Sequence, residues 1–551
     1  MFVRNEGYKQ LDAFASQSKL TKKQTKLWDN SVEHKFFECV FTNINESLFS
    51  ILYSDKKSRP NVPVNQMVGA LILKHLKNWT YDELFTNLSF NMLTRHAIGI
   101  NRMDIDVFSE ASIYNFQTKI VDYFEASGID LINTVFETLT ASQIKHFDIK
   151  TNIQRGDSFL VGSNIVNYSR IRLVVEVLQR LKRVLTPQDK DKYCSLLEKY
   201  SKNTASHFSY KLSKDEVIKE IENIGFIYHQ LVIELKEDYK DDKVFGIFYR
   251  VYNEYFRIEK GVIKVRAGEE ITSSCLMSPD DEDATFRKKR NVKSKGFVAH
   301  VSETIHPDNK INLITDVVVE KNNVGDAEIL ENRLPVMIKN APDLDEYFSD
   351  GGYGSPNVDK LTNKHNITQY QTAFTGRKSP GQQQVETDEE GQVWATCGGG
   401  QRILAEKQKR WKAEFDWNVC ETCPLNKVCK VKIIGGKLKA KRRVYYFEDK
   451  EILSHARMRN MEKLPIKKRT LRANVEATVK EMKRGMKNGK VRVRKLVRVS
   501  IHMILTAIGI NLVRIAQKTR YMFSIIPDSH HRVTYPIQWT AWNVGRICSI
   551  N

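Results

Sequence analysis

The sequence lacks the features of an exported or membrane-spanning protein. The opening stretch MFVRNEGYKQ carries charge but has no apolar core behind it, so we expect no signal peptide. The longest weakly polar run, Val499 to Val513, is 15 residues long. A membrane-spanning helix needs about 20 apolar residues. We therefore interpret this run as a buried helix and expect a cytoplasmic protein with no membrane partner.

The sequence also lacks a disulfide framework. Only eight cysteines occur in 551 residues, and four of them are grouped between positions 397 and 429. This distribution favours metal binding or free thiols in a reducing compartment. The other four have no ligand-like spacing, and we interpret them as ordinary thiols: Cys39, Cys194, Cys275 and Cys548.

Acidic residues are outnumbered. Lysine and arginine number 87 against 66 aspartate and glutamate residues, which leaves a formal charge of +21. Such an excess favours a polyanionic partner, either nucleic acid or an acidic membrane surface. The alternative is a merely soluble basic protein, but the charge is crowded, since residues 461–500 hold fourteen Lys and Arg against three Glu and no Asp. With 41% apolar residues the chain is globular, and its length predicts three or four structural units.

Helical periodicity begins at Val64 and returns along the chain. Thr80 and Glu83 form a T-x-x-E capping box that opens a helix. The short helices of residues 60–140 are compatible with a DNA-binding helix-turn-helix or with simple packing. Further helices are predicted over 129–141, 169–185, 323–339, 470–487 and 496–516.

Strand-like segments with clustered β-branched residues separate these helices. Residues 297–305 and 311–319 predict an antiparallel pair joined by the turn HPDNK. Shorter strand-like pieces lie within 146–160, 347–348, 367–372 and 444–447.

Three acidic residues, far apart in sequence, suit metal-dependent phosphoryl transfer. Asp157 lies in QRGDSFLVGSNI, Asp350 precedes the glycine turn of SDGGYGSP, and Glu476 lies between cations on a predicted helix. Mg²⁺ prefers oxygen ligands, and two such ions about 4 Å apart can serve an in-line displacement. Each acid alone would usually be a solvated surface group. Asp148 in HFDIKTN competes with Asp157, and spacing alone does not decide between them.

The grouped cysteines, Cys397, Cys420, Cys423 and Cys429, form the pattern C-x22-C-x2-C-x5-C. Four thiolates with a CxxC pair suit a tetrahedral structural Zn²⁺. The alternative is a set of free thiols in a poorly packed insertion.

Two basic runs flank the predicted helix that carries Glu476. The first contains Lys441, Arg442 and Arg443, and the second contains Arg492 and Arg494. A charge run is usually a solvated face, but the position of these two favours a surface that follows DNA phosphates.

These motifs resemble a known family. QRGDSFLVGSNI and SDGGYGSP are similar to the first- and second-aspartate segments of bacterial insertion-sequence transposases of the DDE class. Arg472-x3-Glu476-x6-Lys483 fits the R-E-K part of their Y-R-E-K signature, although Arg469 stands where the family has tyrosine. The segment SDKKSRPNVPVNQMVGALILKHLKNWTYDEL resembles their helical N-terminal domain.

The resemblance implies an α/β chain with an RNase H-like catalytic core. Asp157, Asp350 and Glu476 would be catalytic and would bind two Mg²⁺ ions, with Mn²⁺ as a substitute. Arg472 and Lys483 would contact DNA phosphates, or else pair with Glu476 or solvent. The family also has similar cysteines at this place, which favours zinc. The enzyme would hydrolyse a phosphodiester at the element end, and the freed 3′ hydroxyl would attack target DNA.

The expected partners are double-stranded DNA, at element ends and target, and a second copy of the chain when on DNA. The expected location is the bacterial cytoplasm, at the nucleoid. Two alternatives remain: a catalytically silent, transposase-derived DNA-binding protein, and an RNase H-like nuclease without end preference. The predicted domains are a helical N-terminal DNA-binding domain (1–140), core segments (141–165, 263–376 and 461–520), a helical insertion (166–262), a β-rich cysteine-containing insertion (377–460) and a C-terminal tail (521–551).

Overall fold

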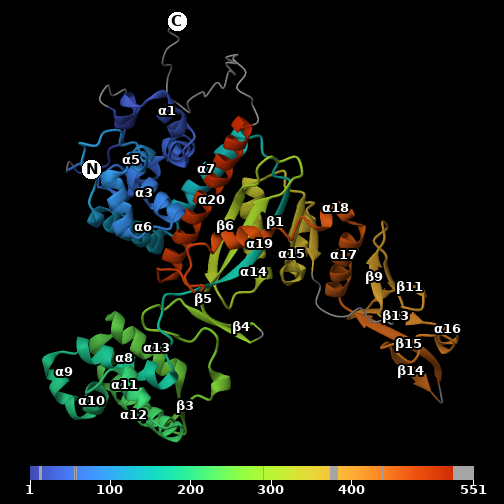
Figure 1. Cartoon of the computed structure of the whole chain (residues 1–551). Helices are drawn as coiled ribbons and strands as arrows, with labels where there is room; N and C mark the ends of the chain where they lie inside the picture. Colours follow the sequence, from blue (N-terminus) through green and yellow to red (C-terminus); the bar gives the residue numbers. More distant parts are fainter. Residues whose placement is uncertain are drawn as a thin grey trace, which may run out of the picture.

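The computed structural model describes residues 1–10, 15–54, 56, 59–289, 291–372, 382–436 and 439–524. A mixed sheet forms its centre (Figure 1). The strands are β1 (Ile153–Gly162), β4 (Thr285–Lys289), β5 (Val292–Thr304), β6 (Ile314–Lys321), β7 (Glu346–Asp350) and β8 (Thr368–Thr372). Most of the predicted C-terminal tail, from residue 525 onward, lies outside the described residues.

The sheet has the topology expected from the resemblance. β5 pairs antiparallel with β6, as the two β-branched runs predicted. It also pairs antiparallel with β1, and its first residues pair with β4. β1, β7 and β8 run parallel. The order β6-β5-β1-β7-β8, with only β5 reversed against its neighbours, is that of an RNase H-like α/β fold. This confirms the predicted fold class.

Among the described residues, seven α-helices precede the sheet, and the last helix of the chain's described part joins them to it. They are α1 (Lys22–Asp29), α2 (Val32–Cys39), α3 (Val64–Lys77), α4 (Tyr81–Phe90), α5 (Met92–Ala97), α6 (Glu110–Ser127) and α7 (Leu131–His146). The predicted capping box opens α4, where Thr80 accepts from the Glu83 amide. α20 (Leu496–Ser524) packs against α3, α7 and β6 (Figure 1), so that these helices and the sheet share one hydrophobic core.

α20 is longer than the sequence pattern predicted. Within the described residues it is the one helix long and apolar enough to cross a membrane, over Leu496–Lys518. More than half of that window is buried inside the protein, which is the behaviour of a core helix.

A helical lobe interrupts the sheet between β1 and β4. It comprises α8 (Arg170–Val184), α9 (Pro187–Lys192), α10 (Cys194–Ser201), α11 (Ala205–Tyr210), α12 (Lys214–Tyr239), α13 (Lys243–Tyr255) and the hairpin β2 (Phe256–Glu259) and β3 (Val262–Val265). The lobe has a hydrophobic core of its own, in which Tyr228 stacks on Phe248.

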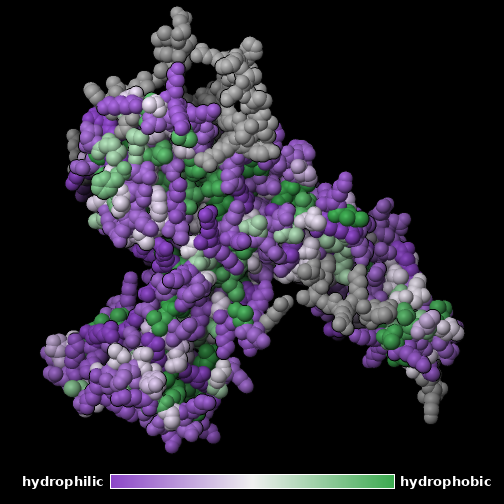
Figure 2. Space-filling model, viewed as in Figure 1, coloured by the Kyte–Doolittle hydropathy of each residue, from purple (hydrophilic) through white to green (hydrophobic). Residues whose placement is uncertain are grey.

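A smaller β-rich lobe follows β8. It contains β9 (Gln384–Thr387), β10 (Val393–Thr396), β11 (Arg402–Leu404), β12 (Glu406–Lys407), β13 (Trp411–Phe415), α16 (Trp417–Glu421), β14 (Lys432–Gly436) and β15 (Lys439–Phe447). These strands form a three-stranded and a four-stranded sheet. The visible surface of the protein is largely hydrophilic, but apolar side chains gather at the tip of this lobe (Figure 2), where Val419 and Val428 are exposed.

The remaining helices flank the sheet or lead away from it. They are α14 (Asp326–Asn340), α15 (Pro356–Lys364), α17 (Asp449–Lys463), α18 (Ile466–Arg469) and α19 (Val475–Met482). α19 is shorter than the helix predicted over 470–487, because residues 470–474 form turns before it. Its buried face is formed by Val475, Thr478 and Met482.

A buried carboxylate fastens α19 to the sheet. Glu303 on β5 is 1% exposed and lies 2.7 Å from the Arg155 Nε on β1 and 2.7 Å from the Arg514 Nη1 on α20. The Thr478 hydroxyl on α19 donates to the same carboxylate at 2.7 Å. The Arg155 guanidinium also donates to the carbonyl oxygen of Leu471, in the turn before α19. One buried acid therefore holds two strands and two helices together.

Replacing Glu303 with alanine would leave the buried Arg155 without its carboxylate partner, and Arg514 with only the more exposed Glu481. We expect Glu303→Ala to lower the free energy of unfolding by about 3–5 kcal/mol, as when one partner of a buried ion pair is removed. Chemical denaturation would measure the change. Glu125→Ala, on the exposed face of α6, is the control and should unfold like the wild type. Equal stability of the two variants would contradict the anchoring role of Glu303.

Candidate functional site

The structure brings two of the three predicted acids together. Asp157 lies on β1 and Asp350 ends β7, the strand that runs parallel to β1. Residues 153–155 pair with 346–348, and continuing this register places Asp157 level with Asp350. Asp148, the competing acid, lies in an exposed turn before β1 with a positive φ of 49°. The parallel register thus favours Asp157 over Asp148 as the partner of Asp350.

One guanidinium bridges the two aspartates. The Arg472 Nη2 lies 3.3 Å from Asp157 Oδ2 and 3.9 Å from Asp350 Oδ2. Arg472 itself is only 18% exposed, and its Nε is buried without a hydrogen-bond partner. The turn before α19, which the Glu303 cluster holds against the sheet, therefore delivers a positive charge to the carboxylate pair.

A fourth acid, which the sequence analysis missed, lies beside this pair. Asp326 opens α14, and its Oδ1 accepts a hydrogen bond of 2.7 Å from the hydroxyl of Ser158, the residue after Asp157. Burial raises the pKa of Asp157, and the nearby negative charges of Asp350 and Asp326 raise it further, against the lowering effect of Arg472. In the sequence, Asp326 could have been noticed because it lies near the start of the helix predicted over 323–339, shortly after a strand-like run.

Glycine keeps the space around the carboxylates open. A Cβ at Gly352 would lie 3.0 Å from Asp350 Oδ1 and 3.1 Å from Asp326 Oδ2. The amide of Gly352 donates to Asp350 at 2.8 Å. A side chain at this position would therefore fill the space between the two acids.

A buried polar network supports both strands beneath the aspartates. Tyr353, which follows the glycine turn, donates to or accepts from His300 Nδ1 at 2.8 Å. His300 also contacts Ser302, which in turn contacts the Tyr347 hydroxyl at 2.9 Å. Burial lowers the pKa of His300 to about 4, so its ring is neutral near pH 7. A Cβ at Gly156, next to Asp157, would collide with the Tyr347 hydroxyl.

The third predicted acid stands apart from the pair. Glu476 lies in the first turn of α19, which packs against β1, but its side chain is exposed. Its carboxylate makes no hydrogen bond or ion pair with a residue of the described segments. Across those segments, no group of three His, Cys, Asp or Glu side chains is arranged to hold a metal ion. The side chains of the triad are thus not gathered around one point in this conformation.

The carboxylates still have the chemistry that Mg²⁺ requires. Asp157 and Asp350 offer hard oxygen donors on two adjacent central strands of the sheet, and both are partly exposed, at 17% and 30%. The absence of a side chain at Gly352 keeps the approach between Asp350 and Asp326 free of a further group. The donors therefore fit a divalent cation, with Glu476 the member that would have to turn toward it.

The predicted DNA-contacting cations have different surroundings. Lys483 is exposed, with its Nζ 5.2 Å from the centre of the Phe159 ring. Arg492 is also exposed, while Arg494 donates to the carbonyl oxygen of Asn164 at 2.7 Å.

In the β-rich lobe, Lys441 lies over the Trp417 ring and Arg442 pairs with Glu414 at 3.2 Å. The predicted DNA contact of Arg443 does not agree with the structure, because this residue is only 4% exposed. Its guanidinium donates to the carbonyl oxygens of Asn426 and Val431, at 3.0 and 2.9 Å. Alternation along β15 turns Arg443 inward, so it supports the cysteine loop.

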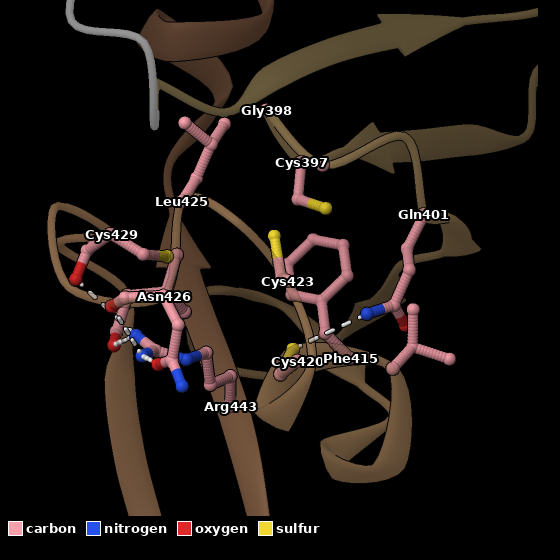
Figure 3. Close-up of a pocket in the computed structure, with 13 residues that line it drawn as sticks. Cys397, Gly398, Gln401, Phe415, Cys420, Cys423, Leu425, Asn426, Cys429 and Arg443 are labelled. Carbon is pink, nitrogen blue, oxygen red and sulfur yellow. Dashed lines mark hydrogen bonds between the residues drawn. The ribbon is translucent and has the colours of Figure 1, made fainter.

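The four grouped cysteines line one small pocket in that lobe (Figure 3). The side chains of Cys397 and Cys423 point toward one another, and Cys420 accepts a hydrogen bond of 3.2 Å from Gln401 Nε2. A Cβ at Gly399 would lie 2.8 Å from Cys423 Sγ, so glycine is needed here. Burial raises the pKa of Cys420, and the neighbouring Cys397 and Cys429 raise it further. The four thiols are a suitable donor set for zinc, although in this structure they are not arranged around one common point.

Comparison with protein families adds independent support. A model described as a transposase domain (DUF772) matches residues 24–119, and one described as a transposase DDE domain matches residues 393–516. The second match covers the four cysteines, Arg472, Glu476 and Lys483, whereas neither match includes Asp157 or Asp350. No curated protein matches the chain significantly. These two matches, at the N-terminal helices and at the last part of the core, confirm that the chain is related to insertion-sequence transposases of the DDE class.

Proposed function

We propose that this protein binds the ends of an insertion sequence and cuts and joins DNA through Asp157, Asp350 and Glu476. The observation that carries the proposal is the pairing of Asp157 and Asp350 around Arg472 on an RNase H-like sheet. The family matches support a DNA substrate, and transposases of this class generally use divalent metal ions.

Each residue has a defined task in this proposal. Asp157 and Asp350 would hold two Mg²⁺ ions, or Mn²⁺ in their place, and Glu476 would have to turn inward from α19 to join them. The bound ions would activate the attacking oxygen and stabilise the leaving one. With metal ions bound, the two carboxylates would no longer need the positive charge of Arg472. Its guanidinium would then be free to contact the phosphate at the cleavage position. Lys483 contacts a neighbouring phosphate.

The proposal includes the partners and location. Two DNA ends must meet for transposition, so the protein acts as a dimer on DNA at the bacterial nucleoid. The exposed cations Lys441, Arg442, Arg492 and Arg494 would then follow the DNA backbone.

A silent DNA-binding protein is the second candidate, because Glu476 stands away from the aspartates and no metal-ligand group forms in the described segments. The two functions differ in one outcome, DNA cleavage in Mg²⁺. An RNase H-like nuclease would cleave with no preference for particular ends.

Asp350→Asn should abolish cleavage and leave DNA binding intact, because the amide keeps the size but removes a metal-binding charge. We expect the cleavage rate to fall at least about 100-fold on a DNA fragment that carries the sequences flanking this gene. The matched control is Asp345→Asn, an exposed acid just before the same strand, which should cleave normally. Wild-type protein that binds this DNA but never nicks it in Mg²⁺ or Mn²⁺ would establish the silent alternative.

Glu476→Gln should separate catalysis from folding. Since Glu476 has no partner in the described segments, the variant should melt at the wild-type temperature while cleavage falls at least about 100-fold. Thermal unfolding and the cleavage assay measure the two effects. Normal cleavage by this variant would remove Glu476 from the proposed triad and leave Asp326 as the nearest other acid.

We further propose that Cys397, Cys420, Cys423 and Cys429 hold one structural Zn²⁺. Arg443 and Gly399 would support the loops that carry these thiols. The ion would stabilise a lobe with a small apolar core.

Purified protein should therefore contain about one zinc per chain, and Cys423→Ser should lose it and unfold the β-rich lobe more readily. Elemental analysis and limited proteolysis measure these effects. Cys194→Ser, at an exposed free thiol in the helical lobe, should keep its zinc. Metal-free wild-type protein that resists proteolysis equally well would overturn the zinc proposal.

A further inference from the structure

A second pocket opens where the N-terminal helices meet the core. Its walls are the end of α3 and the start of α4, the C-terminal end of α19 with the turn after it, and α20. The cavity has a volume of about 760 Å³. This is within the range of pockets that bind small organic ligands, and it is large enough for a nucleotide.

Positive charge dominates the lining. Five cations line the pocket against one acid, Glu481; the cations are Lys74, Lys77, Arg484, Arg492 and Arg498. Glu481 is already paired with Arg514 at 2.7 Å, and Lys77 with Glu33 at 2.6 Å. The acid in the wall therefore does not neutralise the other cations.

Four of these cations have no carboxylate within 4.0 Å among the residues the structure describes: Lys74, Arg484, Arg492 and Arg498. The Lys74 Nζ lies over the Tyr81 ring, 4.5 Å from its centre. Burial lowers the pKa of Lys74, and the nearby charge of Arg492 lowers it further. Cations that gather in a half-enclosed space, where the one lining acid is already paired, create a strong field for an anion.

The two histidines in the wall do not add to this positive charge. His75 Nε2 and His502 Nδ1 lie 3.1 Å apart, in a hydrogen bond between the rings. Burial lowers the pKa of both, to about 4 for His502, and Lys74 and Arg492 lower it further. Both rings are therefore neutral near pH 7, and the charge of the pocket is that of its lysines and arginines.

We infer that this pocket holds backbone phosphates of the DNA strand that passes the proposed active site. The inference rests on the proposed function for the identity of the polyanion. The same helix serves both sites, because Glu476 lies in the first turn of α19 and Met482, at its end, lines the pocket. Six residues of helix span about 9 Å, which is two to three nucleotides at a rise of about 3.4 Å.

The inference can be tested by binding without cleavage. The protein is full-length Asp350→Asn, and the probe is a duplex oligonucleotide with the sequence that flanks this gene. We expect Lys74→Gln/Arg492→Gln to weaken binding several-fold and to reduce the slope of log K against log salt by about 2, one unit for each phosphate contact. The matched control, Lys211→Gln/Lys219→Gln, removes two exposed charges from the helical lobe and should bind unchanged.

Lysine acetylation read by mass spectrometry gives a second readout on the same protein. Bound DNA should protect Lys74 and leave Lys211 reactive. A salt slope equal to the control, together with equal Lys74 labelling with and without DNA, would overturn the inference even if the wild type cleaves DNA. If the salt slope and the Lys74 labelling change as expected but the wild type does not cleave DNA, the pocket remains a DNA-binding site. Only the proposed catalysis is then contradicted. Protein that binds no DNA overturns both.

Discussion

A single buried carboxylate organises the proposed active site. Glu303 lies inside the sheet, where an isolated charge would be prohibitively costly, so it is stable only with both Arg155 and Arg514 in place. Those arginines come from opposite sides, one from β1 and one from α20. The cluster thereby fixes the position of α19 and of the turn that carries Arg472. The geometry of the proposed site thus depends on a polar core and not on apolar packing alone.

The same arrangement explains how charge is distributed along α19. At its start, the turn with Arg472 meets the aspartates, and Glu476 faces solvent. At its end, the helix joins a wall of lysines and arginines from three other segments. A polyanion lying along this helix would meet acids that can hold metal ions at one point and cations that can hold phosphates at the next.

Part of the fold and of the candidate site could be predicted from the sequence, and part could not. The glycine turn pointed to Asp350, because tight turns depend on local residue types, whereas Asp157 was preferred to Asp148 only through the family resemblance of its flanking residues. Asp326 was missed, since its place beside Asp350 and its hydrogen bond with Ser158 arise only from the folded arrangement of distant segments. Arg443 was assigned to DNA because a charge run does not reveal which side chain points inward on a strand. The helix predicted over 470–487 was longer than α19. Helix propensity does not reveal the turns before α19, which the hydrogen bond from Arg155 to the Leu471 carbonyl oxygen stabilises.

The central claim is that Asp157, Asp350 and Glu476 share bound metal ions. Anomalous diffraction from crystals of the protein with Mn²⁺ and DNA tests this claim most directly. We predict manganese peaks beside Asp157 and Asp350, with the Glu476 carboxylate turned inward to contact one of them. Peaks elsewhere, or a Glu476 that still faces solvent beside a metal-filled site, would contradict it.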